Sequence, residues 1–104
     1  MSVLMSLAMF PTNTTGSKSK EVSEILNIIK DSGLKYQLTS MCTIVEAETL
    51  KELLDLVNLC YLKLEKLGYD RVYAVVNFDI RTNGENRIES KISSVEKHIG
   101  IVSK

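Results

Sequence analysis

The stretch RVYAVVNFDIR, residues 71–81, alternates between apolar and mixed side chains with the two-residue period of a β-strand. Successive side chains of a strand point to opposite faces of a sheet. The strand should therefore turn one apolar face towards a helix layer and a second, more polar face away from it. The apolar set is Val72, Ala74, Val76, Phe78 and Ile80, and the mixed set is Arg71, Tyr73, Val75, Asn77, Asp79 and Arg81.

Residues 49–68, just before this strand, have the three- and four-residue apolar spacing of an amphipathic helix. Thr49 and Glu52 stand in the positions of a capping box, which satisfies free amides at a helix start. Gly68 marks the expected end of the helix. The apolar stripe is expected to comprise Leu50, Leu53, Leu54, Val57, Cys60, Leu64 and Leu67.

The first half of the chain also shows the two-residue period of strands and the helical period, here in the order strand, helix, strand, strand. Residues 3–10 form a short apolar run that Pro11 should end, because proline cannot donate to a sheet. Residues 22–29 have helical spacing and close near Gly33, with Ser17 or Ser19 as the expected cap. Residues 36–47 are β-branched and alternating, with a reversal at residues 40–42, which predicts two paired strands.

The resulting order is β-α-β-β-α-β, which predicts an α+β, ferredoxin-like sandwich. Right-handed crossovers place both helices on the same face of a four-stranded antiparallel sheet and leave the other face free. A further helical pattern, Ile88, Ile92, Val95 and Ile99, follows Asn83-Gly84 and predicts an additional C-terminal helix.

The composition fits a single domain over residues 1–104. The 13 Lys and Arg residues balance 13 Asp and Glu residues, so no charge excess favours nucleic acid or an anionic membrane. The apolar start has no basic leader and is short for a signal peptide. We therefore expect a cytoplasmic protein with neither nucleic acid nor membrane as partner.

The sequence gives little sign of catalytic or metal chemistry. The spacing of Cys42 and Cys60 matches no zinc or redox motif, and Cys60 is expected in the core. His98 is the single histidine and has no evident partner. Without a Gly-rich phosphate loop, a paired nucleophile or a metal-ligand cluster, we expect no enzymatic activity, no cofactor and no metal.

The free face of the predicted sheet is only partly polar. The first strand adds Leu4, Ser6 and Ala8 to the mixed set of the last strand. An exposed, partly apolar sheet face on a small domain is typically covered by a second subunit. The sequence therefore predicts a homodimer or homotetramer, and such interfaces favour small-molecule sites.

Several segments together resemble the thiamine-binding protein family. They are Pro11 with the Thr/Ser-rich segment that follows it, the hairpin at residues 40–48, the stretch at residues 68–73, and Asp79-Ile80-Arg81. The resemblance implies a ferredoxin-like domain that forms dimers or tetramers and binds thiamine or its pyrimidine-type relatives. The hairpin departs from the family pattern, because Cys42 stands where the family usually has glycine.

The resemblance and the strand parity together suggest ligand roles. Thiamine has a cationic thiazolium ring and an aminopyrimidine with adjacent donors and acceptors. Glu46 or Asp79 would supply negative charge, and Met41 would pack on a ring through its polarizable sulfur. Arg81 would fix Asp79 or meet a hydroxyl or phosphate end. The hydroxyl and amide groups expected to contact the pyrimidine edge are those of Ser6, Thr43 and Asn77.

A second reading is a regulatory or structural ferredoxin-like module that oligomerises without a small-molecule ligand, or with a metal. Fold alone does not decide between these functions.

Overall fold

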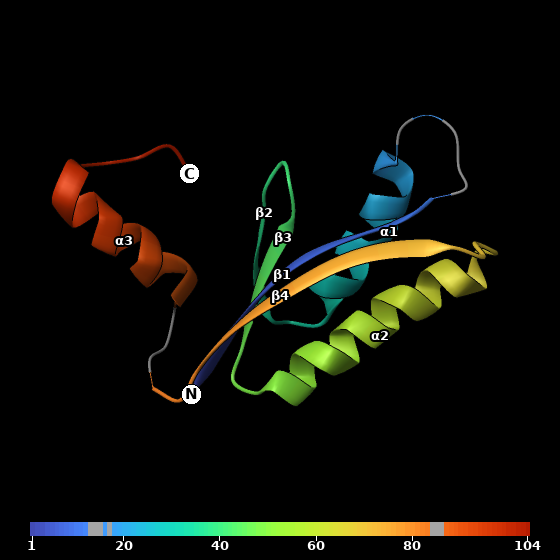
Figure 1. Cartoon of the computed structure of the whole chain (residues 1–104), viewed down its shortest axis with the longest axis horizontal. Helices are drawn as coiled ribbons and strands as arrows, with labels where there is room; N and C mark the ends of the chain where they lie inside the picture. Colours follow the sequence, from blue (N-terminus) through green and yellow to red (C-terminus); the bar gives the residue numbers. More distant parts are fainter. Residues whose placement is uncertain (13–15, 17, 84–86) are drawn as a thin grey trace.

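The computed structural model describes residues 1–12, 16, 18–83 and 87–104, and it confirms the predicted α+β, ferredoxin-like architecture (Figure 1). The predicted Gly84 turn position and Ser17 cap lie outside the described residues. The elements are β1 (Ser2–Pro11), α1 (Ser19–Asp31), β2 (Lys35–Leu38), β3 (Thr43–Ala47), α2 (Leu50–Lys66), β4 (Val72–Arg81) and α3 (Arg87–Ile99).

The four strands form one antiparallel sheet in the order β2-β3-β1-β4. β1 is therefore central, although it is first in the chain. It pairs with β4 along its whole length, from Ser2 opposite Arg81 to Pro11 opposite Val72. As predicted, Pro11 is the last residue of the strand.

α1 and α2 cover one face of this sheet, and α3 lies on the side of the other face (Figure 1). The core between the sheet and the two helices is almost entirely aliphatic and sulfur-bearing. Its buried members are Val3, Met5, Leu7, Met9, Ile25, Ile29, Val45, Ala47, Leu53, Leu56, Cys60 and Leu64. Each of the Val, Leu, Ile and Met side chains among them contributes roughly 1.5–3 kcal/mol by leaving water.

The inward stripe of α2 differs from the prediction at three leucines. Leu56 is buried, whereas Leu54 and Leu67 are about half exposed. The three- and four-residue spacing of Leu53, Leu56, Cys60 and Leu64 keeps one face of the helix on the sheet, and Leu54 falls outside that face. The prediction that placed Leu54 and Leu67 on the inward stripe, and left Leu56 out of it, was wrong.

The helix ends follow local chemistry. Thr49 Oγ1 accepts a hydrogen bond from the Glu52 amide at 3.2 Å and donates to the Glu52 carboxylate at 2.9 Å, so the capping pair closes through the hydroxyl. After α1, Gly33 adopts a φ of 77°, a conformation that suits glycine. Ser19 is the first residue of α1 and follows the cap position, Lys18, so it does not act as the predicted cap.

α3 begins beside the sheet and then diverges from it (Figure 1). The radius of gyration is 14.9 Å, above the roughly 13 Å expected for a compact domain of this length. Within the described residues, no helix is long and apolar enough to cross a membrane.

Candidate functional site

The sheet face opposite α1 and α2, here called the open face, is built from alternate residues of all four strands. Its members are Lys35, Gln37, Ile44, Glu46, Ser2, Leu4, Ser6, Ala8, Phe10, Tyr73, Val75, Asn77, Asp79 and Arg81. The alternation of residues 71–81 predicted this placement for β4, and the structure confirms it. On the helix side, Val72 and Val76 pack against the core, while Ala74, Phe78 and Ile80 remain exposed because β4 is an edge strand.

Ser6 and Asn77 lie opposite each other on the open face, midway along β1 and the edge strand β4. Asn77 Nδ2 donates to Ser6 Oγ at 3.3 Å. This bond leaves the Asn77 carbonyl oxygen as an acceptor and the Ser6 hydroxyl hydrogen as a donor, side by side. Ile44 pairs with Ser6 from the other side, and Ala8 and Val75 form the next pair along the strands. A polar pair in apolar surroundings can orient a flat heterocycle.

Glu46 serves as the cap of α3. Its Oε2 accepts hydrogen bonds from the Ser2 hydroxyl at 2.8 Å and from the Arg87 amide at 2.9 Å. Its Oε1 accepts from the Ile88 amide at 3.2 Å. Burial raises the pKa of Glu46, but these hydrogen bonds outweigh it and the net pKa is lowered. A carboxylate at a helix N-terminus satisfies free amides and interacts favourably with the helix dipole.

Asp79 lies on the other side of β1 from Glu46, since both residues pair with Leu4. It holds the same helix by contacting side chains of α3. Its carboxylate accepts from Lys91 Nζ at 2.6 Å and forms an ion pair with the buried guanidinium of Arg87. Those two partners lower the pKa of Asp79 to about 2. Arg87 also donates to the backbone carbonyls of Ser2 and Asp79, both at 3.1 Å.

We call the set Ser2, Glu46, Asp79, Arg87 and Lys91 the α3 anchor. Lys35 of β2 adds an ion pair to Glu89 of α3 at 2.8 Å. Basic and acidic groups balance in this cluster, so it presents little net charge to a ligand. Sequence reasoning found both carboxylates but missed Arg87, because nothing in the helical spacing of residues 88–99 distinguishes a buried arginine from a solvated one.

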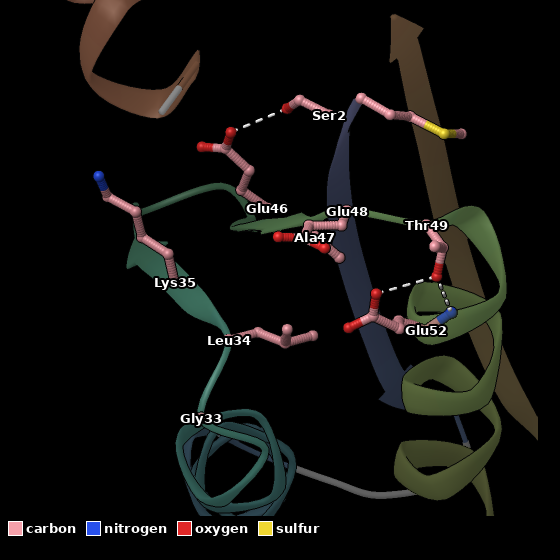
Figure 2. A pocket seen from close by; sticks show the side chains of 10 residues that line it. Ser2, Gly33, Leu34, Lys35, Glu46, Ala47, Glu48, Thr49 and Glu52 are labelled. Carbon is pink, nitrogen blue, oxygen red and sulfur yellow. Dashed lines mark hydrogen bonds between the residues drawn. The ribbon is translucent and has the colours of Figure 1, made fainter. Parts of the chain in front are cut away.

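A groove of about 640 Å³ adjoins the α3 anchor between the end of α1 and the start of α2 (Figure 2). Leu34 and Glu52 extend into it from opposite sides (Figure 2). Glu46, Glu48 and Glu52 line it together with Lys35. Its volume suits a small molecule. However, the Glu46 carboxylate caps α3, and the Glu52 carboxylate accepts a hydrogen bond from Thr49, the cap residue of α2. Two of the three carboxylates therefore already serve the fold.

Met41 and Thr43 lie elsewhere, around a smaller cavity of about 170 Å³ between the β2–β3 hairpin and α1. Thr43 is buried and shares its face with Val45 and Ala47, against the helices. Thr43 and Ser6 therefore lie on opposite faces of the sheet, so the prediction that Thr43 contacts the same pyrimidine edge as Ser6 and Asn77 was wrong. Met41 is 85% exposed at the hairpin tip.

Arg81 completes the predicted set at the anchor end of β4, opposite Ser2. Its Nε donates to Asn83 Oδ1 at 3.0 Å, and the described structure pairs Asp79 with Arg87 and Lys91. The seven predicted ligand residues thus fall into three groups: Ser6 with Asn77, Met41 with Thr43, and Glu46 with Asp79 and Arg81. A cluster of three or more His, Cys, Asp or Glu side chains able to hold a metal does not occur within residues 1–12, 16, 18–83 and 87–104.

The fold and this face define a small ferredoxin-like protein with a polar pair, Ser6 and Asn77, on the sheet face that α1 and α2 leave free. The family model described as "Thiamine-binding protein" matches residues 5–96, and the chain belongs to that family. The chain is also 30% identical to a UPF0045 protein of Methanothermobacter thermautotrophicus, over 89% of this chain and 95% of that protein. It is 33% identical to the UPF0045 protein YqgV of Bacillus subtilis, over 82% and 85% of the two chains.

Solved structures give the same result. A hypothetical protein of Methanocaldococcus jannascii superposes with a TM-score of 0.82 at 26% identity, covering 92% of this chain and 97% of that one. A Thermotoga maritima protein, provisionally named for thiamine biosynthesis and salvage, superposes with a TM-score of 0.79 at 25% identity, covering 91% and 99%. The fold and the thiamine-related family predicted from the sequence are both confirmed.

Proposed function

We propose that this chain binds thiamine or a related pyrimidine or thiazole heterocycle, without transforming it, as a homo-oligomer. The observation that carries the proposal is the membership of residues 5–96 in the thiamine-binding protein family. The name of the Thermotoga maritima neighbour agrees with a thiamine-related role.

The pyrimidine half of the ligand fits the Ser6–Asn77 pair by its hydrogen-bonding pattern. An aminopyrimidine offers an amine donor beside a ring-nitrogen acceptor, and the pair offers the complementary acceptor and donor. The α3 anchor adds little net charge, because its two carboxylates, Glu46 and Asp79, are balanced by Arg87 and Lys91, both of which pair with Asp79. We therefore assign recognition to hydrogen bonding of the pyrimidine rather than to attraction of the thiazolium.

The other residues of the predicted set have different parts in this proposal. Glu46 and Asp79 act indirectly by holding α3, and Arg81 lies at the rim. Met41 and Thr43 line a cavity of about 170 Å³, which is smaller than the roughly 300 Å³ typical of small-molecule pockets. We therefore assign them no direct contact with the ligand.

Isothermal titration calorimetry with thiamine, the isolated aminopyrimidine and oxythiamine tests this proposal. Oxythiamine replaces the amine by an oxo group and reverses the donor and acceptor order, so it should bind more weakly than thiamine. Asn77→Ala removes a hydrogen bond to the ligand and the partner of Ser6, and it should weaken thiamine binding about tenfold. Recovery of unchanged thiamine after prolonged incubation would support binding without chemistry.

Asn58→Ala is the matched control, because Asn58 is an exposed asparagine on α2, which lies across the sheet. It should bind like the unmodified protein. Equal binding by Asn77→Ala and Asn58→Ala would refute the assignment of the pair. No heat with any ligand, from folded protein, would favour the second function, a regulatory or structural oligomerisation module. The engagement of Glu46 and Asp79 by α3 is the observation that favours that alternative.

A further inference from the structure

The outer surface of the helix layer carries a groove of about 410 Å³ between α1 and α2. Ile28 of α1 and two leucines of α2, Leu59 and Leu62, line it. Leu59 is 54% exposed and Leu62 is 44% exposed, because both lie outside the face of α2 that packs on the sheet. Single exposed leucines are normal on a protein surface, but apolar side chains of two helices that line one groove indicate a binding surface.

This groove is separate from the site of the proposed function. α1 and α2 cover one face of the sheet, whereas Ser6 and Asn77 lie on the other. A molecule in the groove therefore has no contact with that polar pair, and binding at either place can be measured without the other. The volume of the groove lies within the roughly 300–1,000 Å³ of small-molecule pockets.

The two ends of the groove differ because α1 and α2 are antiparallel. Lys63 pairs with Glu24 at 3.7 Å, which joins the two helices. Tyr69, further along the chain from Lys63, donates to Glu21, which precedes Glu24. Asp31 lies about two turns after Glu24 on α1, or about 10 Å from it along the helix axis. The ion pair thus crosses the helix junction at one end of the groove, and Asp31 lines the other end.

Charge is segregated between these two ends. Lys66 follows Lys63 by about one turn of α2, which places it about 15 Å from Asp31 along the helix axes. Within the part of the chain that the structure describes, Lys63 pairs with Glu24, whereas no carboxylate forms an ion pair with Lys66. The Lys66 ammonium group offsets part of the dipole at the end of α2 and remains able to receive an anion. Asp31 disfavours an anion at the opposite end.

We infer that the groove binds a single-chain carboxylate, an amphiphile of the fatty-acid type, with its head group at Lys66. Its alkyl chain lies along Leu62, Leu59 and Ile28, which remove it from water. The carboxylate stays at the solvated rim of the groove, so binding requires desolvation of the chain and not of the charge.

The size of the groove favours an alkyl chain over a protein helix. An α-helix with its side chains is about 10–12 Å wide, so a segment 15 Å long occupies about 1,200 Å³. The groove holds about 410 Å³. A partner helix would also meet the ion pair of Lys63 and Glu24, which crosses the junction that such a helix would follow. An extended chain can end beside that pair.

Isothermal titration calorimetry of the full chain with octanoate, decanoate and dodecanoate, each below its critical micelle concentration, tests this ligand class. Binding should saturate at one molecule per chain. Each methylene that enters the groove should tighten binding about three- to fourfold. The gain should stop once the alkyl chain exceeds the roughly 15 Å between the two ends. Dodecyltrimethylammonium, with the same chain on a cationic head group, should bind at least about fivefold more weakly than dodecanoate.

Two pairs of variants separate the contribution of the chain from that of the head group. Leu59→Asp should weaken dodecanoate binding at least about tenfold, because a carboxylate then lies in the path of the chain. Leu54→Asp is its control and should bind like the unmodified protein, since Leu54 is 51% exposed on α2 but does not line the groove. Lys66→Gln should weaken dodecanoate binding about three- to fivefold. Lys51→Gln, at an exposed lysine near the start of α2, should leave it unchanged.

Methyl spectra of the folded protein locate the bound chain. Saturating dodecanoate should shift the methyl signals of Ile28, Leu59 and Leu62 and leave those of Leu54 in place. Circular dichroism of Leu59→Asp should match that of the unmodified protein, because this side chain is already half exposed. Leu59→Asp should also keep any thiamine binding, so a failure of the proposed function would not alter the outcome for the groove.

Three results of the titrations would each overturn the inference: no saturable binding below the micelle concentration, equal binding by Leu59→Asp and Leu54→Asp, or equal affinity for the cationic amphiphile. Two other occupants are tested with the same variants. Dissociation of an oligomer by Leu59→Asp in sedimentation velocity would show that a second copy fills the groove. Retention on phosphatidylglycerol vesicles that dodecanoate does not displace would assign the surface to a membrane. Either result would also refute the alkyl-chain ligand.

Discussion

The cap that Glu46 places on α3 can be tested by Glu46→Gln. Glutamine keeps the size of the side chain, but its amide nitrogen cannot accept the hydrogen bonds that one carboxylate oxygen now takes. In the structure both oxygens accept, from Ser2 and Arg87 on one side and from Ile88 on the other. The substitution therefore leaves at least one helix amide unsatisfied and removes a negative charge from the helix N-terminus.

The expected loss follows from these two effects. An N-cap interaction is worth about 0.5–2 kcal/mol, and a charge beside the helix end adds about 0.3–1 kcal/mol at a partly exposed site. We expect the attachment of α3 to weaken by about 1–2 kcal/mol. That loss corresponds to a roughly 5- to 30-fold rise in the population in which α3 is detached.

Hydrogen exchange measured by mass spectrometry reports this population directly, because amides in α3 exchange when the helix detaches. Peptides covering residues 87–99 should lose protection by about 5- to 30-fold, while peptides from β1 and α2 should change little. Glu48→Gln is the matched control, since Glu48 is exposed beside the same groove. Protection of α3 within about twofold of the unmodified protein would refute the capping role.

Three further outcomes are expected. The pKa of Asp79, about 2 in the folded protein, lies below its ordinary value near 3.9. The stability that Asp79 contributes is therefore present above about pH 4 and is lost as the pH falls towards 2. The melting temperatures of the unmodified protein and Asp79→Asn should converge over that interval, and a constant difference would contradict the ion pairs. Leu53→Ala should lower the free energy of unfolding, measured by chemical denaturation, by about 2–5 kcal/mol because Leu53 is fully buried. Leu54→Ala, at a half-exposed neighbour, should change it by less than about 0.5 kcal/mol. Similar losses for the two variants would contradict the orientation of α2. Burial raises the pKa of Cys60 to about 11, so a Cys42→Ser variant should show no reactive thiol at pH 8 until it is unfolded, and rapid labelling of the native variant would show that α2 opens.

Local periodicity was sufficient to predict the fold and the two faces of the sheet. The alternation of residues 71–81 placed Asn77 and Asp79 on the open face, and the spacing on α2 placed Cys60 in the core. These signals are strong because a shift of one residue would expose every apolar side chain of a strand. The same logic shows why the prediction for Thr43 failed. Thr43 is two residues from Val45 on β3 and therefore faces the helices, whereas the prediction assigned it to the ligand because of its hydroxyl group.

The contacts made by α3 could not be predicted in the same way. Glu46 and Arg87 are 41 positions apart, and their contact depends on where a terminal helix meets the sheet. A lone carboxylate near a strand end has the same sequence signature whether it binds a ligand, caps a helix or faces water. Only the tertiary arrangement shows that Glu46 serves the fold, which moves the proposed ligand contacts towards Ser6 and Asn77.

The central position of β1 has a consequence for the folding of the chain during synthesis. β1 leaves the ribosome before both of its neighbours, because β3 begins at Thr43 and β4 ends at Arg81. Until that last strand has emerged, one edge of an apolar strand has no native partner, and unpaired edges invite pairing with other chains. The growing chain must therefore shelter Val3, Leu4 and Met5 until β4 has emerged, and aggregation through this edge is a hazard throughout that interval.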